Sequence, residues 1–254
     1  MLAAGLFDRF PAERVFGLHN RPQLPVGRFA MRAGPAGAGC DDFTIRLEGR
    51  GCHAGWPHLG RDPIVAGAQL VLALQTLVAR QVDPLDQAVV SVTRHAGGDA
   101  HNVIPGAVEL WGMVRTYRPE TRDFLRRRLS EVAEGVAVAS GVGASLTYVS
   151  SLPPLVNGLE DAAFGADVAA EVVGEAGVDR DPPPVMSAED FAFMLQAKPG
   201  AFVWMGIGRA DEGRLIHTPI YDFNDEALSY GASYWARLTE RFLAKHPRAP
   251  EGMP

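Results

Sequence analysis

The sequence has 254 residues, of which 47% are hydrophobic and 21% charged, and its formal net charge is −6. This acidic balance argues against nucleic acid as the main partner, because phosphate binding needs clustered Lys and Arg. The sequence contains no run of eighteen or so uninterrupted apolar residues, so it predicts no membrane span. Asp8 and Arg9 interrupt the N-terminus too early for the apolar core of a signal peptide. Cys40 and Cys52 make no disulfide framework, so we expect a cytoplasmic location.

The first forty residues predict two short strands and a crossing between domains. Residues 13–19 (ERVFGLH) indicate a short buried strand, and the turn-prone segment 20–27 separates it from a second strand over 28–32. The Gly/Ala/Pro stretch over 33–39 is typical of a connection between domains.

The next section predicts a strand and a long helix. Phe43, Ile45 and Leu47 alternate with polar residues, which is the pattern of a half-buried strand. Asp62-Pro63 supplies an N-cap with proline at the first helical position. The apolar face expected for this helix carries Ile64, Ala68, Val71, Leu74 and Val78.

Two further strands, a helix and a last strand follow. Residues 87–95 and 107–117 are rich in β-formers and flank the turn-like segment GGDAHNVIPG. A second helix is expected from Pro119 to Gly141, followed by a strand over 144–149. The order β-α-β-β-α-β predicts a split βαβ, ferredoxin-like domain.

The pattern of predicted elements changes after Pro153-Pro154. Helices are expected over about 160–173 and 190–196 and at the C-terminus, with Leu228, Ala232, Trp235, Leu238 and Phe242 on the apolar face of the last one. AFVWMGIG at 201–208 lacks polar alternation and so indicates a strand buried on both faces. Buried strands alternating with helices predict an α/β layer, to which the N-terminal strands should belong.

Several polar residues are candidates for chemistry, although each has an ordinary structural explanation as well. His19 and His217 both follow predicted central strands, where the ligands of α/β domains gather, but a single histidine is more often structural. His53 lies in a glycine-rich loop that could present its imidazole or could simply bond a backbone carbonyl. Asn102 lies in a turn. Arg115, in a predicted strand, could grip a carboxylate with two hydrogen bonds or be an ordinary surface arginine.

Taken together, these segments resemble the M20 peptidase family, in its hippurate hydrolase and auxin-conjugate amidohydrolase branch. The matching segments, in order, are VFGLHNRPQLPVG, GRGCHAGWPHLGRDPIVAGAQLV, SVTRHAGGDAHNVIPGAVELWGMVRTY, PPPVMSAEDFAFML, and HTPIYDFNDEAL with GASYW. The resemblance implies an α/β fold: a partial M20 catalytic α/β domain, residues 1–38 and 151–254, interrupted by a ferredoxin-like lid and dimerisation domain over 39–150. It also implies a homodimer and hydrolysis of N-acyl amino acids.

The resemblance assigns roles residue by residue. His19 and His217 correspond to ligands of a divalent metal, zinc or manganese, and His53 to a lid histidine that reaches the partner subunit's site and polarises the scissile carbonyl. Asn102 corresponds to a substrate-binding asparagine and Arg115 to the arginine that holds the substrate carboxylate. Two more residues, Ser187 and Glu189, belong to a loop that lines the substrate site.

One departure from the family pattern bears on activity. Members of this branch carry Cys-Gly-His-Asp-Gly-His and Pro-Ala-Glu-Glu-Gly segments before the equivalent of residue 1, and these supply the other metal ligands and the general base. Neither segment is in this sequence. We therefore expect an N-terminally truncated amidohydrolase with an incomplete metal site, inactive by itself. The alternatives are a non-catalytic dimerisation or small-molecule-binding protein, and one half of a split enzyme.

Overall fold

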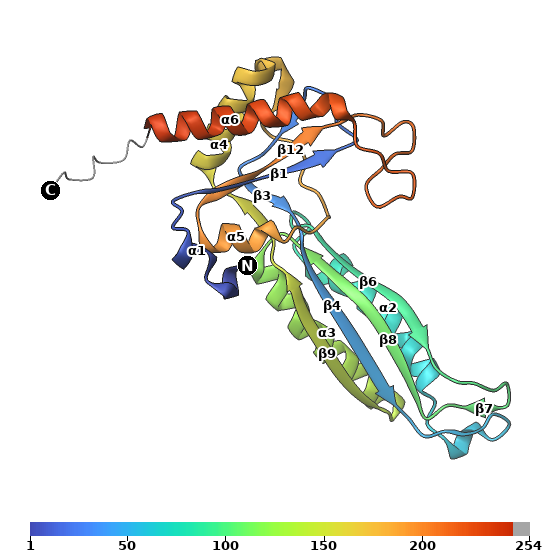
Figure 1. Ribbon diagram of the computed structural model, residues 1–254. Coiled ribbons are helices and arrows are strands. Elements are labelled where there is room, and N and C mark those ends of the chain that lie inside the picture. The colour runs from blue at the N-terminus through green and yellow to red at the C-terminus, as the bar shows by residue number, and fades with distance from the viewer. Residues whose placement is uncertain (246–254) are drawn as a thin grey trace. The chain divides into compact units, whose positions relative to one another are not determined.

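The computed structural model describes residues 1–245, which fold into two compact units (Figure 1). Unit 1 is built from three stretches of chain: Met1–Ala36, Leu155–Val185 and the residues from Phe191 onward. Unit 2 comprises Gly37–Pro154 and the short segment Met186–Asp190. The chain therefore starts one unit, builds the second, and returns to the first.

Unit 2 is a four-stranded antiparallel sheet with two long helices, in the expected order β-α-β-β-α-β. Its elements are β4 (Gly39–Glu48), β5 (Cys52–His53), η2 (Pro57–Leu59), α2 (Pro63–Gln81), β6 (Ala88–Ala96), β7 (Val103–Ile104), β8 (Ala107–Thr116), α3 (Pro119–Ser140) and β9 (Gly143–Leu152). The sheet order is β6-β8-β4-β9, so the first and last long strands of the unit are neighbours. This arrangement confirms the ferredoxin-like fold predicted from the periodicities.

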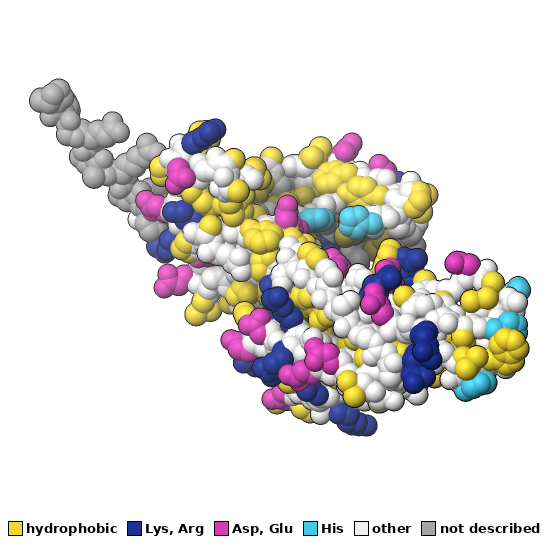
Figure 2. Space-filling view, turned by 90° about the horizontal axis from the view of Figure 1, so that it is seen from below, with side chains coloured by type: hydrophobic (Ala, Val, Ile, Leu, Met, Phe, Trp, Pro, Cys, Tyr) yellow, Lys and Arg dark blue, Asp and Glu magenta, His cyan; other side chains and the backbone are white. Residues whose placement is uncertain are grey.

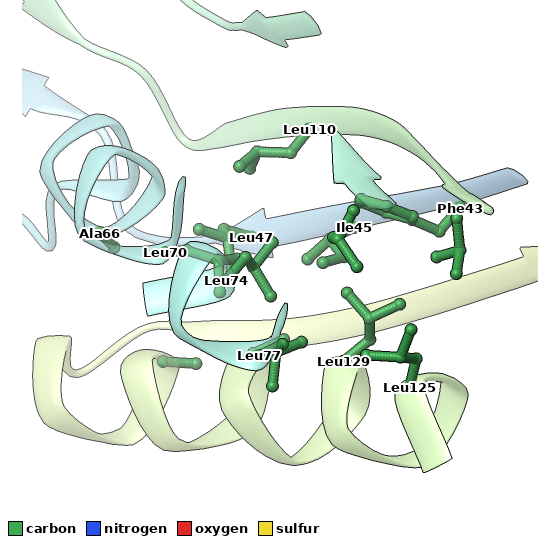
Figure 3. Close-up of a cluster of buried hydrophobic side chains, with 14 of the residues drawn as sticks. Phe43, Ile45, Leu47, Ala66, Leu70, Leu74, Leu77, Leu110, Leu125 and Leu129 are labelled. Carbon is green, nitrogen blue, oxygen red and sulfur yellow. The ribbon is translucent and has the colours of Figure 1, made fainter. Parts of the chain in front are cut away.

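The core of unit 2 forms where both helices cover one face of this sheet. Phe43, Ile45 and Leu47 point to that face from β4, as their alternation predicted, and meet leucines of α2 and α3 (Figure 3). The other face of the sheet has no helix over it among the elements of unit 2 and carries the alternate side chains, including Trp111 and Arg115. A one-sided sheet of this kind leaves a surface available for other contacts.

Helix α2 begins where the sequence predicted, with the Asp62 carboxylate accepting from the amide of Ile64 at 2.8 Å. Its core face was predicted wrongly at two positions, because Ile64 and Ala68 are exposed. The buried side is instead formed by Ala66, Leu70, Leu74 and Leu77. The helix is apolar nearly all round, so its periodicity could not select a face. By length and composition alone it would also pass for a membrane-spanning helix, but its buried face packs in the core of unit 2.

Unit 1 is an α/β layer. Its elements are η1 (Leu2–Ala4), α1 (Leu6–Arg9), β1 (Val15–Arg21), β2 (Phe29–Ala30), β3 (Gly34–Gly37), β10 (Leu155–Asn157), α4 (Leu159–Val173), η3 (Glu175–Gly177), β11 (Val178–Asp179), α5 (Phe191–Ala197), β12 (Gly200–Gly206), η4 (Asp225–Ala227) and α6 (Leu228–Lys245). The sheet order is β1-β12-β2-β11, with β1 parallel to β12. Helices α4 and α6 cover one face through Val203 and Met205, and α5 covers Phe202 on the other.

Three expectations for unit 1 need correction. The first strand is half-buried along its whole length rather than buried, because within residues 1–245 it pairs on one side only, with β12. The stretch 33–39, expected to be a plain connection, contains β3, which pairs with β10. In α6 the largest fully buried side chain is Tyr234, whose ring stacks on Phe29 at 5.3 Å, whereas Leu228 and Trp235 are exposed. Strand β12 is buried on both faces, as predicted.

Candidate functional site

His19 lies near the carboxyl end of β1, on the face of the sheet that also carries Phe202. It stands opposite Trp204 in the parallel register, and the two ring centroids are 5.4 Å apart. Because β1 and β12 run parallel, the residues that follow both strands emerge at the same edge of the sheet. Ligand sites of open α/β sheets form at this edge.

The ring of His19 is held by a backbone carbonyl. Its Nδ1 lies 2.7 Å from the carbonyl oxygen of Asn20. A carbonyl oxygen can only accept, so Nδ1 carries a proton, and the tautomer that this contact favours has its lone pair on Nε2. Metal-binding histidines have their second ring nitrogen fixed in this way.

His217 lies in the loop between β12 and η4, and it is exposed. Its φ of 64° is in the left-handed region that non-glycine residues rarely adopt, and strain of this kind gathers at functional sites. The loop is cross-braced by Asp222, which pairs with Arg209 and Arg214. The side chain of Asn20, next to His19, donates a hydrogen bond to the hydroxyl of Tyr221 in the same loop.

The described part of unit 1 contains two histidines, His19 and His217, and Figure 2 shows histidine surface on this unit. Among residues 1–245, no three His, Cys, Asp or Glu side chains come together in a group that could hold a metal ion. A catalytic zinc site needs three protein ligands. The described residues therefore do not form a complete metal site.

His53 and Asn102 come together at one end of unit 2, although they are 49 positions apart. His53 ends β5, opposite Val103 of β7, and the amide of Ala54 donates to the carbonyl of Asn102 at 2.8 Å. Both side chains are exposed. The structure thus places His53 in a two-stranded ribbon rather than in the loop that the sequence predicted.

The hydrogen bond to the ring of His53 favours the tautomer opposite to that of His19. The backbone amide of Gly55 donates to Nδ1 of His53 at 3.0 Å, so Nδ1 must accept and Nε2 carries the proton. A Cβ added at Gly55 would lie 3.2 Å from Nδ1, which explains why glycine suits this close approach. His53 therefore presents an N–H donor, whereas His19 presents a lone pair.

Arg115 lies on β8, on the sheet face without helices, opposite Cys40 of β4. Its Nη1 is buried, and among the described residues it has no hydrogen-bond partner. Burial raises the pKa of the Cys40 thiol, and the positive charge of Arg115 offsets part of that rise. A guanidinium with an unused buried N–H is suited to an incoming carboxylate.

Arg115 is far from His53 and Asn102 within one copy of unit 2. The ribbon that carries these two residues adjoins the Ala107 end of β8, and Arg115 lies eight positions further along that strand. At about 3.4 Å per residue this separation is roughly 27 Å along the strand. One small substrate cannot reach both ends.

The segment with Ser187 and Glu189 belongs to unit 2 by its contacts, although it lies far along the chain. The carbonyl of Ser187 accepts from the amide of Ala38 at 3.1 Å, which fixes the backbone there. Ser187 is exposed and Glu189 half-buried. Their assignment to substrate binding stays a prediction.

Comparison with known proteins identifies the family. The model of peptidase family M20/M25/M40 matches residues 1–241. The chain belongs to this family. It is 38% identical to N-acetylcysteine deacetylase of Bacillus subtilis over 94% of the chain and 60% of the relative, and 33% identical to hippurate hydrolase of Campylobacter jejuni over 96% of the chain and 63% of the relative.

A solved M20 structure has the same fold. The YXEP protein of Bacillus subtilis, described as a dinuclear metal binding peptidase from the M20 family, superposes with a TM-score of 0.78 at 31% identity. The match covers 96% of this chain and 60% of that one. The present chain thus spans about 60% of the length of the M20 relatives named here.

Some residues that shape this M20 chain were missed in the sequence. Tyr221 and Asp222 brace the loop of His217, and Trp56 packs its indole on the ring of His53 at 5.0 Å. Tyr221 and Trp56 each lie within four positions of a candidate histidine. A survey of the neighbours of each histidine for hydroxyl and aromatic groups would have found them.

Proposed function

We propose that this protein is an M20-type amidohydrolase that acts on N-acyl amino acids. Family membership supports the reaction class, and the named relatives include a deacetylase and a hippurate hydrolase. The observation that carries the proposal is that hydrogen bonds favour opposite tautomers in two imidazoles. His19 has its lone pair on Nε2, and His53 has its N–H donor there. A ligand histidine and a carbonyl-polarising histidine need these two different states.

The proposed roles follow from the groups that each residue presents. Arg115 binds the substrate carboxylate through its unused Nη1, and Asn102 adds an amide that can donate or accept. The Nε2–H of His53 donates to the acyl oxygen, where negative charge develops as the amide is attacked. Ser187 and Glu189 are proposed as further substrate contacts.

We assign His19 and His217 as two ligands of a divalent metal, zinc or manganese. A complete site would need further ligands and a general base besides these two histidines. Because the described residues do not make a complete site, we expect no hydrolysis by the chain alone. The two unpaired cysteines favour a cytoplasmic location.

We further propose a homodimer formed through α2 and β6. The separation of about 27 Å between Arg115 and the His53 ribbon means that the ribbon must serve a second copy if both act on one substrate. Strand β6 pairs on one side only within the described residues, and the exposed apolar face of α2 lies beside it. The groove between them, about 510 Å³, is lined by Ala68, Val71, Leu72 and Val92–His95. An edge strand next to an apolar helix face suits a self-complementary partner.

Binding tests the proposal without turnover. Titration of the chain with N-acetylglycine and with its neutral amide should show roughly tenfold tighter binding of the acid, and Arg115→Gln should remove that preference. Glu109→Gln, on the same strand and face, serves as a matched control that keeps the preference. Equal binding of acid and amide by the wild type would contradict the substrate class. Hydrolysis by the chain alone would contradict the expectation of an incomplete site, and a folded dimer that binds neither compound would favour the non-catalytic alternative.

A further inference from the structure

The turn that ends in Trp56 builds a mixed polar and apolar surface around His53. The amide of Trp56 donates to the carbonyl of His53 at 2.9 Å, and the same turn brings the Gly55 amide onto Nδ1. The indole then lies against the imidazole, with ring centroids 5.0 Å apart and an interplanar angle of 37°. The turn thus brings the backbone of Trp56 close to His53, and the indole lies against the imidazole.

Trp56 is 59% exposed, which is unusual for so large an apolar side chain. Leu59 and Val103, the latter opposite His53 in the ribbon, are also about half exposed. Figure 2 shows hydrophobic and histidine side chains gathered at this end of unit 2. An apolar group held next to a hydrogen-bond donor is the arrangement that binds a ligand with one polar atom and a flat apolar body.

We infer that Trp56 selects N-acyl amino acids whose acyl group is aromatic, an inference that rests on the proposed role of His53. An acyl oxygen that accepts from Nε2 lies about 2.9 Å from it, and the carbonyl carbon is only about 1.2 Å further. The first atoms of the acyl group therefore come within roughly 4 to 5 Å of the imidazole, beside the indole. A benzoyl ring at that place stacks on Trp56, whereas an acetyl methyl group covers little of it.

The alternative role for Trp56 is to hold His53 in place. A positioning role would affect acetyl and benzoyl compounds equally, because both present the same carbonyl to Nε2. A specificity role affects the benzoyl compound alone. The two roles are therefore separable with one pair of ligands.

Saturation-transfer NMR on the full chain makes this test without turnover. With N-benzoylglycine, the benzoyl protons should receive saturation from the wild-type protein. The transfer should be at least threefold weaker in Trp56→Ala and should be mostly retained in Trp56→Phe. The glycyl methylene signal should persist in both variants, and N-acetylglycine should give equal transfer in all three proteins. Trp235→Ala, another partly exposed tryptophan, is the control.

Three results would overturn the inference. These are no transfer to the benzoyl protons in the wild type, an unchanged benzoyl signal in Trp56→Ala, and parallel loss for both ligands. Failure of the proposed function is seen separately. If the acid and amide titrations show no dependence on Arg115 while the benzoyl signal still depends on Trp56, the carboxylate assignment fails and the role of Trp56 stands.

Discussion

The side-chain amide of Asn20 donates a hydrogen bond to the hydroxyl of Tyr221, and this bond ties the end of β1 to the loop that carries His217. The two candidate ligand histidines are thus on segments linked by a side-chain bond, although they lie 198 positions apart. Replacement of Tyr221 by Phe keeps the ring and removes only the bond. Because one exposed hydrogen bond contributes about 0.5–1.5 kcal/mol, we expect local loosening with little change in global stability.

Hydrogen exchange measures this loosening directly. In Tyr221→Phe, the amides of Thr218 and Tyr221, which bond within the loop, should exchange about threefold to tenfold faster. Amides of β9 in unit 2 should be unchanged. Unaltered exchange in the loop would mean that the Asp222 ion pairs hold it without the Asn20 bond.

A second prediction concerns metal. After dialysis, elemental analysis of the chain should find zinc and manganese well below one equivalent, because His19 and His217 alone make a weak site. Any residual metal should fall further in His19→Ala and remain in His58→Ala, a control outside unit 1. A tightly held equivalent of metal would mean that other side chains complete the site.

A third prediction contrasts two tyrosines. The hydroxyl of Tyr148 donates to the buried carboxylate of Asp41 at 2.6 Å, and Arg122 pairs with the same carboxylate. Tyr148→Phe should therefore lower the free energy of unfolding by about 1–3 kcal/mol in denaturant titrations. The hydroxyl of Tyr234 is buried without a hydrogen-bond partner among the described residues, so Tyr234→Phe should leave stability equal or slightly higher. A loss of equal size in both variants would contradict this reasoning.

Tyr234 also gives a prediction for alkaline pH. Burial raises its pKa in the folded protein above the ordinary value of 10.0, while the unfolded chain ionises near that value. Ionisation of Tyr234 therefore costs the fold nothing below pH 10, whereas above pH 10 the stability of the fold declines at up to about 1.4 kcal/mol per pH unit. Tyr234→Phe should flatten the decline. An identical alkaline slope in the variant and the wild type would show that other groups cause it.

The proposed dimer gives the fifth prediction. Leu72 is 73% exposed on the apolar face of α2, and Leu72→Glu should convert a dimer at micromolar concentration into a monomer in sizing with light scattering. Val138 on α3 is 81% exposed and lies away from that groove, so Val138→Glu should remain dimeric. A monomeric wild-type protein would contradict the proposal that the His53 ribbon of one copy serves the site of a second copy.

The sequence predicted the fold of unit 2 well, because its signals are local. Strand alternation at Phe43 to Leu47 and the Asp62-Pro63 helix start each depend on a few neighbouring residues. The face of α2 was not predictable from such signals. A helix with apolar residues on most sides is oriented by the sheet that it meets, and that is long-range information.

The candidate site was predictable in residue identity more than in chemical state. The sequence patterns around His19 and His53 marked both as candidates. No feature of the neighbouring sequence, however, shows whether Nε2 of each ring carries a lone pair or a proton. That difference depends on the Asn20 carbonyl and the Gly55 amide. The pairing of His53 with Asn102 likewise needs the β5–β7 ribbon, which closes a loop of about fifty residues.

The pairing of β4 with β9 has a consequence for the order of folding. Unit 1 is interrupted by residues 37–154, and its N-terminal stretch must meet its later stretches across that interval. A flexible interval of 118 residues would oppose their meeting by about 4 kcal/mol of loop-closure entropy. Pairing of Cys40 with Leu152 brings the two ends of the interval together within the inserted unit itself. Once unit 2 is folded, the ends of the interval are already close together, and the loop-closure cost no longer opposes unit 1. We therefore expect unit 2 to fold first and to accelerate the assembly of unit 1.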